Sequence, residues 1–136
     1  MGRELLRSIY FIIIEESAQL IRLARTEEPI GAGEEAMARW MEISAVLDRA
    51  GRKGRSLLCD LRLSPPRNDP AFEKMMGQVV PKIHHGFVRN AVLVRLAAGA
   101  LQVRRHARED GIERLVTDSE EQALEYLLRA QSPPAR

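Results

Sequence analysis

The chain lacks several features that mark particular classes of protein. It has 136 residues and a single cysteine, Cys59, so an internal disulfide is excluded and a reducing compartment is favoured. Its apolar stretch Ile9 to Ile14 is six residues long, whereas a membrane-spanning helix needs about 20. It has six aromatic residues, and they do not alternate with basic ones as a base-stacking surface requires. These absences predict a soluble cytoplasmic protein without a transmembrane segment.

Net charge and known motifs exclude further classes. Lysine and arginine number 21 against 19 acidic residues, a net charge of +2, which does not predict nucleic-acid binding. The sequence contains no P-loop, no GxGxxG and no GxSxG. His84 and His85 are adjacent, and therefore cannot form an i, i+4 metal pair on a helix, while His106 is remote. We expect no cofactor and no metal.

The hydrophobic pattern predicts a single α/β domain over residues 1–136, with a core at about 8–130 and a flexible tail at 131–136. Two β-prone runs, 9–15 and 19–25, read as a hairpin. Helical and strand periods then alternate, with strands at "SLLCDLRL", "NAVLVRLA" and "ERLVT". The order ββαβαβαβα predicts a mixed sheet with a parallel portion, covered by about four helices.

Individual residues refine these elements. Helical spacing predicts core-facing stripes in three helices: Ala36, Trp40, Ile43, Leu47 and Ala50; Phe72, Met76, Val79, Ile83 and Phe87; Leu124, Leu127 and Leu128. Pro81 should kink or shorten the second helix, because proline removes a backbone donor. The turn "RKGR" at 52–55 is interpreted as a solvated connection, and Asp118 or Ser119 as a helix cap.

The loop "DLRLSPPRNDPAF", Asp60 to Phe72, joins a strand to a helix, and such loops often bind ligands in α/β sheets. Pro70 suits the first helical position, and Asn68 or Asp69 suits the N-cap before it. A carboxylate is also favoured by the positive end of the helix dipole. Two interpretations stay open for Asp69: capping alone, or reading a partner.

The strand order, "LLCDLR" before a helix-opening loop, and the closing "RLVTDSEEQALEYLL" together resemble the STAS domains, in particular their SpoIIAA-like branch. The resemblance spans about residues 8–130. It implies a mixed sheet with helices largely to one side, and action by binding partners rather than by catalysis. Phosphorylatable members carry a serine at the start of this helix, where Asp69 stands here. Ser64 is the only hydroxyl left in the loop.

Three hypotheses follow for function. The first is a non-enzymatic regulatory domain that docks a protein partner through a surface of Ser64, Arg67, Asn68, Asp69 and Phe72. The second is a module that binds a small ligand, a lipid or a nucleotide, in a groove between sheet and helices. The third is a cysteine enzyme, which Cys59 disfavours because it lies mid-strand among leucines. A homodimer through the apolar face of the hairpin is a further possibility.

The densest positive cluster is "RRHAR". Arg104 and Arg108 share a helical face with Arg105 beside them, enough to hold one phosphate or an acidic partner. The alternative is a solvated face paired with Glu109 and Asp110.

Overall fold

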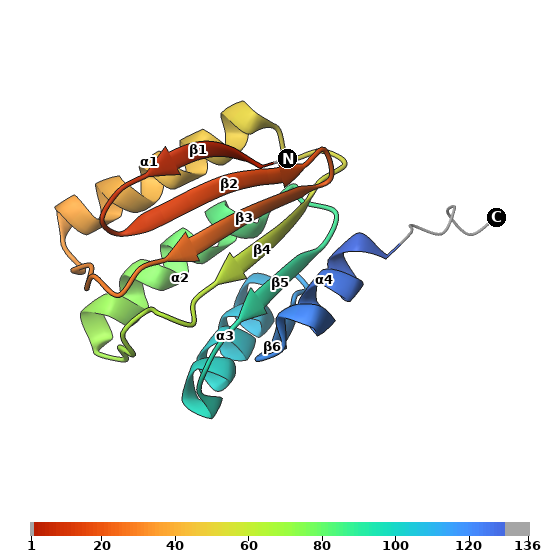
Figure 1. Ribbon diagram of the computed structural model, residues 1–136. Coiled ribbons are helices and arrows are strands. Elements are labelled where there is room, and N and C mark those ends of the chain that lie inside the picture. Colours follow the sequence, from red (N-terminus) through yellow and green to blue (C-terminus); the bar gives the residue numbers. More distant parts are fainter. Residues whose placement is uncertain (1, 130–136) are drawn as a thin grey trace.

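A computed structural model describes residues 2–129, in which six strands form one mixed sheet and four helices cover it (Figure 1). The strands lie in the sheet in chain order, β1 to β6. The first three are antiparallel and β3 to β6 are parallel. The elements are β1 Arg3–Arg7, β2 Phe11–Ser17, β3 Leu20–Arg25, α1 Glu34–Ala50, β4 Ser56–Asp60, α2 Pro70–His84, β5 Asn90–Leu93, α3 Ala97–Asp110, β6 Leu115–Thr117 and α4 Glu120–Leu128.

The α/β class, the mixed sheet and the hairpin are confirmed, but the predicted order ββαβαβαβα misses the first strand. β1 pairs antiparallel with β2 and places the start of the sheet at Arg3 rather than near residue 8. Its sequence, Arg-Glu-Leu-Leu-Arg, does not alternate between apolar and polar residues. Pairing with β2 holds it in place, and its charged ends suit the edge of a sheet.

The two faces of the sheet carry different helices. Alternate strand residues such as Leu57 and Cys59 face a large core shared with α1, α2 and α3, whereas Leu58 faces a small core with α4. Figure 1 shows α1 and α2 crossing the far face of the sheet. The apolar face of the hairpin, including Phe11 and Leu23, belongs to the large core. The helices of the same chain therefore cover that face, and a homodimer through another surface is not tested.

The predicted helix stripes are largely confirmed. In α1, Ala36, Trp40, Ile43 and Leu47 are buried. In α2, Val79 and Ile83 are buried, and the helix continues past Pro81 to its end at His84. The prediction for Leu128 is wrong, since its side chain is 51% exposed at the end of α4. Ser119 caps α4 by accepting a hydrogen bond from the backbone N–H of Gln122.

The interpretation of "RKGR" as a solvated turn is wrong for its first residue. Arg52 is buried, and its Nη1 donates to the carbonyl oxygens of Ile83 and His85, each at 2.9 Å. Its Nε donates to Asp48 at 2.7 Å. Arg52 therefore satisfies carbonyls at the end of α2 and fastens that end to α1, a role that local charge did not reveal.

Candidate functional site

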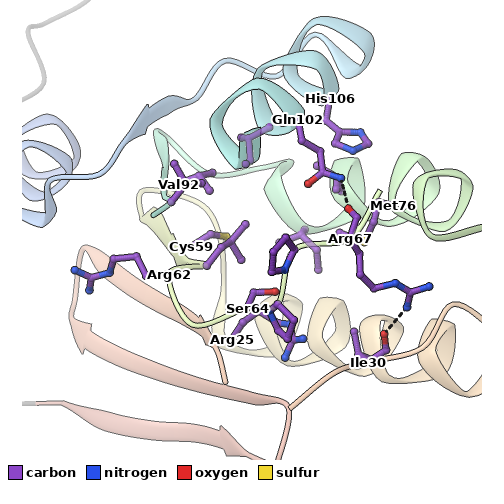
Figure 2. Close-up of a pocket in the computed structure, with 18 of the residues that line it drawn as sticks. Arg25, Ile30, Cys59, Arg62, Ser64, Arg67, Met76, Val92, Gln102 and His106 are labelled. Atoms are coloured by element: carbon purple, nitrogen blue, oxygen red, sulfur yellow. Dashed lines mark hydrogen bonds between the residues drawn. The ribbon is translucent and has the colours of Figure 1, made fainter. Parts of the chain in front are cut away.

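A cavity of about 160 Å³ lies between the sheet and helices α1 to α3, beneath the loop that joins β4 to α2 (Figure 2). An engineered apolar cavity of about 150 Å³ is large enough for benzene. The cavity is therefore large enough for a small molecule, but its volume is below the roughly 300 Å³ at which drug-sized pockets begin. Its walls are mainly apolar and include Phe11, Leu23, Cys59, Met76, Val79 and Val92.

Three buried side-chain nitrogens, each on a residue that lines the cavity, have no hydrogen-bond partner within residues 2–129. They are Trp40 Nε1, His106 Nε2 and Arg114 Nη1. His106 Nε2 lies 3.5 Å from Glu73 Oε2 without forming a hydrogen bond. A buried polar group left without a partner costs about 1–3 kcal/mol. Each of these nitrogens is inaccessible to a water molecule, so each lies behind the cavity surface and leaves a hydrogen bond unmade.

Arg114 lines the cavity from the connection between α3 and β6. Its side chain is 0% exposed, and its Nη2 pairs with both carboxylate oxygens of Asp110, at 2.5 and 2.6 Å. Its Nε donates to the carbonyl of Ile112 at 3.1 Å. Arg114 precedes β6, whereas the 60–70 loop follows β4, and the strands from β4 to β6 are parallel. The cavity thus extends from the loop edge of the sheet towards the opposite edge.

The charged residues in the wall are all basic. Arg25, Arg62, Arg67, Arg95 and Arg114 line the cavity together with His84 and His106, and no aspartate or glutamate does. Arg25 is 5% exposed and donates to two backbone carbonyls, those of Tyr10 at 2.7 Å and Glu28 at 3.0 Å. Burial lowers the pKa of Arg25, but a guanidinium keeps its charge at neutral pH. Arg62, Arg67 and Arg114 pair with carboxylates outside the lining, so Arg25 and Arg95 are the wall arginines without a carboxylate partner within residues 2–129.

The predicted N-cap is confirmed. Asp69 accepts a hydrogen bond from the backbone N–H of Phe72 at 3.3 Å, and Pro70 is the first helical residue. Arg67 holds the same carboxylate in a bidentate pair, with both contacts at 2.8 Å. Hydrogen bonds from Arg67 keep the pKa of Asp69 below its usual value.

Arg67 also fixes the loop to its surroundings. Its Nη1 donates to the carbonyl of Ile30 at 2.9 Å, and its own carbonyl accepts from Gln102 Nε2 at 2.9 Å, the two bonds drawn in Figure 2. The guanidinium lies 4.9 Å from the centre of the Phe72 ring. Hydrogen bonds therefore hold the loop both to the segment before α1 and to α3, so the loop forms a fixed part of the cavity wall.

The structure divides the predicted partner surface. Ser64, Arg67 and Phe72 line the cavity, whereas Asn68 is exposed and Asp69 lies outside the lining.

The predicted arginine cluster on α3, Arg104, Arg105 and Arg108, does not line the cavity. Arg104 and Arg108 are exposed, and Arg105 pairs with Glu73 at 2.5 Å and with Glu109 at 3.6 Å. Asp110 pairs with Arg114, so the expectation that it neutralises this cluster is wrong.

Cys59 is confirmed as a buried side chain. Burial raises the pKa of its thiol to about 12, which keeps it protonated at neutral pH. His84 is buried too, and its Nδ1–H donates to Asn90 Oδ1 at 2.8 Å, while Asn90 Nδ2 donates to the His84 carbonyl. Nothing in this geometry activates the thiol as a nucleophile. Across residues 2–129, no three histidine, cysteine or acidic side chains gather as metal ligands do.

Among the cavity residues that the sequence analysis does not assign to a site are Arg25, Trp40, His106 and Arg114. A signal existed for Arg25, because Ile21, Leu23 and Arg25 alternate along β3 and a charge there falls on the buried face. His106 likewise follows Val103 by three residues on α3, which places it on the buried stripe. Trp40 was assigned to the core. Arg114 has no comparable local signal, because it lies in a connection.

Substitutions at Asp69 separate its two contacts. Asp69→Asn keeps an oxygen for the Phe72 N–H but loses the charge that pairs with Arg67, and Asp69→Ala loses both. We expect the melting temperature to be highest in wild type, lower in Asp69→Asn and lowest in Asp69→Ala, with a total fall of a few degrees. Thermal unfolding followed by circular dichroism measures this. An alanine variant as stable as wild type would remove the capping role.

Searches of protein-family models, curated proteins and solved structures returned no match to this chain. The STAS resemblance therefore stays a prediction that rests on the sequence pattern. No helix within residues 2–129 combines the length and apolar character needed to cross a membrane.

Proposed function

We propose that this protein is a non-enzymatic module that binds a small, largely apolar molecule in the cavity beneath the 60–70 loop. The observation that carries this proposal is a cavity of about 160 Å³ with mainly apolar walls, bounded by the sheet, helices α1 to α3 and the 60–70 loop. Ligand sites are typically apolar pockets with a few polar groups that converge on the ligand and fix its orientation.

The loop supports the same function from the other side. The bonds of Arg67 to Ile30 and from Gln102 hold the loop over the cavity. Such a wall keeps the site formed before a ligand arrives, which lowers the ordering cost of binding. A lipid fragment fits the apolar walls better than a nucleotide, whose sugar and phosphates need more polar partners.

Docking of a protein partner is a second candidate function, and the exposed apolar side chains beside the loop favour it. Leu63 in the loop is 53% exposed, and Leu96 at the start of α3 is 48% exposed. The STAS resemblance implies a regulatory domain of this kind. Arg67 and Asp69 hold each other, so the better candidates for contact are Leu63, Leu96 and the exposed Asn68. Loss of a copurifying partner in Leu63→Ser plus Leu96→Ser, but not in Asp69→Asn, is the expected result.

A thermal-shift screen against fatty acids, small aromatic compounds and nucleotides tests the ligand site. A compound at 100 times its dissociation constant stabilises the folded state by about 2.7 kcal/mol. Val92→Phe fills the cavity, whereas Val88→Phe adds the same atoms at an exposed position. We expect stabilisation of wild type and Val88→Phe, and none of Val92→Phe. No stabilising compound, or equal shifts in all three proteins, would contradict the proposal.

A further inference from the structure

Exposed leucines lie at one end of the sheet, where the 60–70 loop is beside the start of α3 (Figure 1). Leu63 in the loop is 53% exposed, and Leu96 and Leu101 at the start of α3 are 48% and 67% exposed. A hydrogen bond of 2.9 Å from the N–H of Leu61 to the carbonyl of Leu93 joins the two segments. Large apolar side chains exposed together mark a surface that contacts something else.

The outer face of α3 changes from apolar to basic along the helix. Ala97, Leu101, Arg104 and Arg108 follow one another at i, i+4, i+7 and i+11, and all four are exposed. The buried residues of α3 lie on its other side. The helix therefore presents an apolar first half, next to the loop, and a basic second half.

The arginines of this face are available for contact. Arg95, Arg104 and Arg108 are exposed and have no carboxylate partner in the part of the chain that the structure describes. Asp118 lines the same shallow groove as Arg95 and Arg104, without forming an ion pair with either. Three guanidinium groups thus border the leucines and attract a negatively charged surface.

A lipid bilayer with anionic headgroups matches both halves of this face. Leucines enter the boundary between headgroups and acyl chains, while arginines extend their charged ends to the phosphates. Anionic lipids strengthen such binding by attracting the basic side chains. The neighbouring cavity favours a bilayer over an acidic protein, because Arg95 and Leu96 line both the groove and the apolar cavity. A bilayer is also where small apolar molecules accumulate.

We propose that this protein binds reversibly to the surface of an anionic lipid bilayer through a membrane face at the start of α3. The membrane face consists of Leu63, Leu96, Leu101, Arg95, Arg104 and Arg108. The inference goes beyond the proposed function, since binding to a bilayer requires no ligand in the cavity.

Cosedimentation with lipid vesicles tests the proposal. One set of vesicles is phosphatidylcholine alone, and the other is phosphatidylcholine mixed with phosphatidylglycerol. We expect wild type to bind the mixed vesicles at least tenfold more tightly than the neutral ones, and less tightly as the salt concentration rises. Wild type that binds neither kind, or both equally, would overturn the proposal.

A pair of charge variants locates the basic part of the face. Arg104→Gln with Arg108→Gln is expected to bind the mixed vesicles at least tenfold more weakly than wild type. Arg49→Gln with Lys53→Gln removes the same charge from exposed positions at the end of α1, which α2 separates from α3, and should match wild type. Equal losses in both variants would show a response to net charge alone and overturn the assignment.

A pair of apolar variants tests insertion of the leucines. Leu63→Ser with Leu101→Ser is expected to weaken binding to the mixed vesicles at least tenfold. Val88→Ser with Leu128→Ser changes exposed side chains before β5 and at the end of α4, at the opposite end of the sheet, and should match wild type. Unchanged binding in the Leu63 and Leu101 variant would overturn insertion through this face.

Two outcomes separate membrane binding from the other proposals. Val92→Phe fills the cavity and should bind the mixed vesicles as wild type does, so a ligand screen without a stabilising compound removes the proposed function alone. Wild type that binds no vesicles, but copurifies with an acidic protein that Leu63→Ser plus Leu96→Ser loses, would overturn the bilayer and assign the face to a protein partner.

Discussion

Replacing Arg114 by methionine is expected to lower the free energy of unfolding by about 3–5 kcal/mol, the range found when one partner of a buried ion pair is removed. The Arg114 side chain is 0% exposed and that of Asp110 is 7% exposed. Without the guanidinium, the Asp110 carboxylate stays buried and keeps only the backbone N–H of Ile112 as a hydrogen-bond donor. Urea unfolding at neutral pH measures the loss.

Two comparisons identify the cause of that loss. Arg114→Gln with Asp110→Asn leaves no buried charge, so it should cost clearly less than Arg114→Met alone. Arg105→Met removes an arginine that is 48% exposed from its pair with Glu73, and exposed pairs contribute about 1 kcal/mol or less. Equal losses in Arg114→Met and Arg105→Met would show that the Arg114 pair is not buried in solution.

The second large effect is a loss of stability on acidification that depends on His84. Burial lowers the pKa of His84 from 6.5 to about 4. Between these values the unfolded chain binds a proton that the folded protein does not, so protonation favours unfolding. The stabilisation is fully present above pH 6.5 and is lost as the pH falls towards 4. At 1.36 kcal/mol per pKa unit it amounts to about 3 kcal/mol.

Urea unfolding of wild type and His84→Gln between pH 7 and pH 4 measures this effect. Glutamine can donate to Asn90 Oδ1 as the imidazole does, but it does not titrate. Carboxylates such as Asp60 and Glu120, whose pKa values are lowered, also weaken the fold in acid, and they do so equally in both proteins. The difference between the two curves therefore isolates His84. Parallel curves would contradict its burial as a neutral imidazole.

Local chemistry allowed part of this structure to be predicted from the sequence. The hairpin, the buried strand at Asn90–Leu93 and the stripe of α1 follow from periodicity, because burial imposes the period on the sequence. The cap at Asp69 follows from three neighbouring residues. β1 does not follow, since its pairing with β2 outweighs a sequence without strand character.

The cavity could not be predicted in the same way. A cavity is space that side chains from distant segments leave unfilled, and no residue pattern encodes it. Arg67 donates to the carbonyl of Ile30, 37 positions earlier in the sequence, and Arg114 lines the cavity from the connection before β6. The sequence predicts the loop as a binding region, but with its residues facing a protein partner outside the domain. The structure turns three of them, Ser64, Arg67 and Phe72, towards the cavity.

The intrinsic fluorescence of Trp40 tests ligand binding in the cavity most directly. Trp40 is the only tryptophan in the sequence, is 5% exposed and lines the cavity. Titration with a compound that stabilises the protein in the thermal-shift screen is expected to change its emission saturably in wild type and in Val88→Phe, and to leave that of Val92→Phe unchanged. An emission that stays constant in wild type, or changes equally in Val92→Phe, would contradict binding in the cavity.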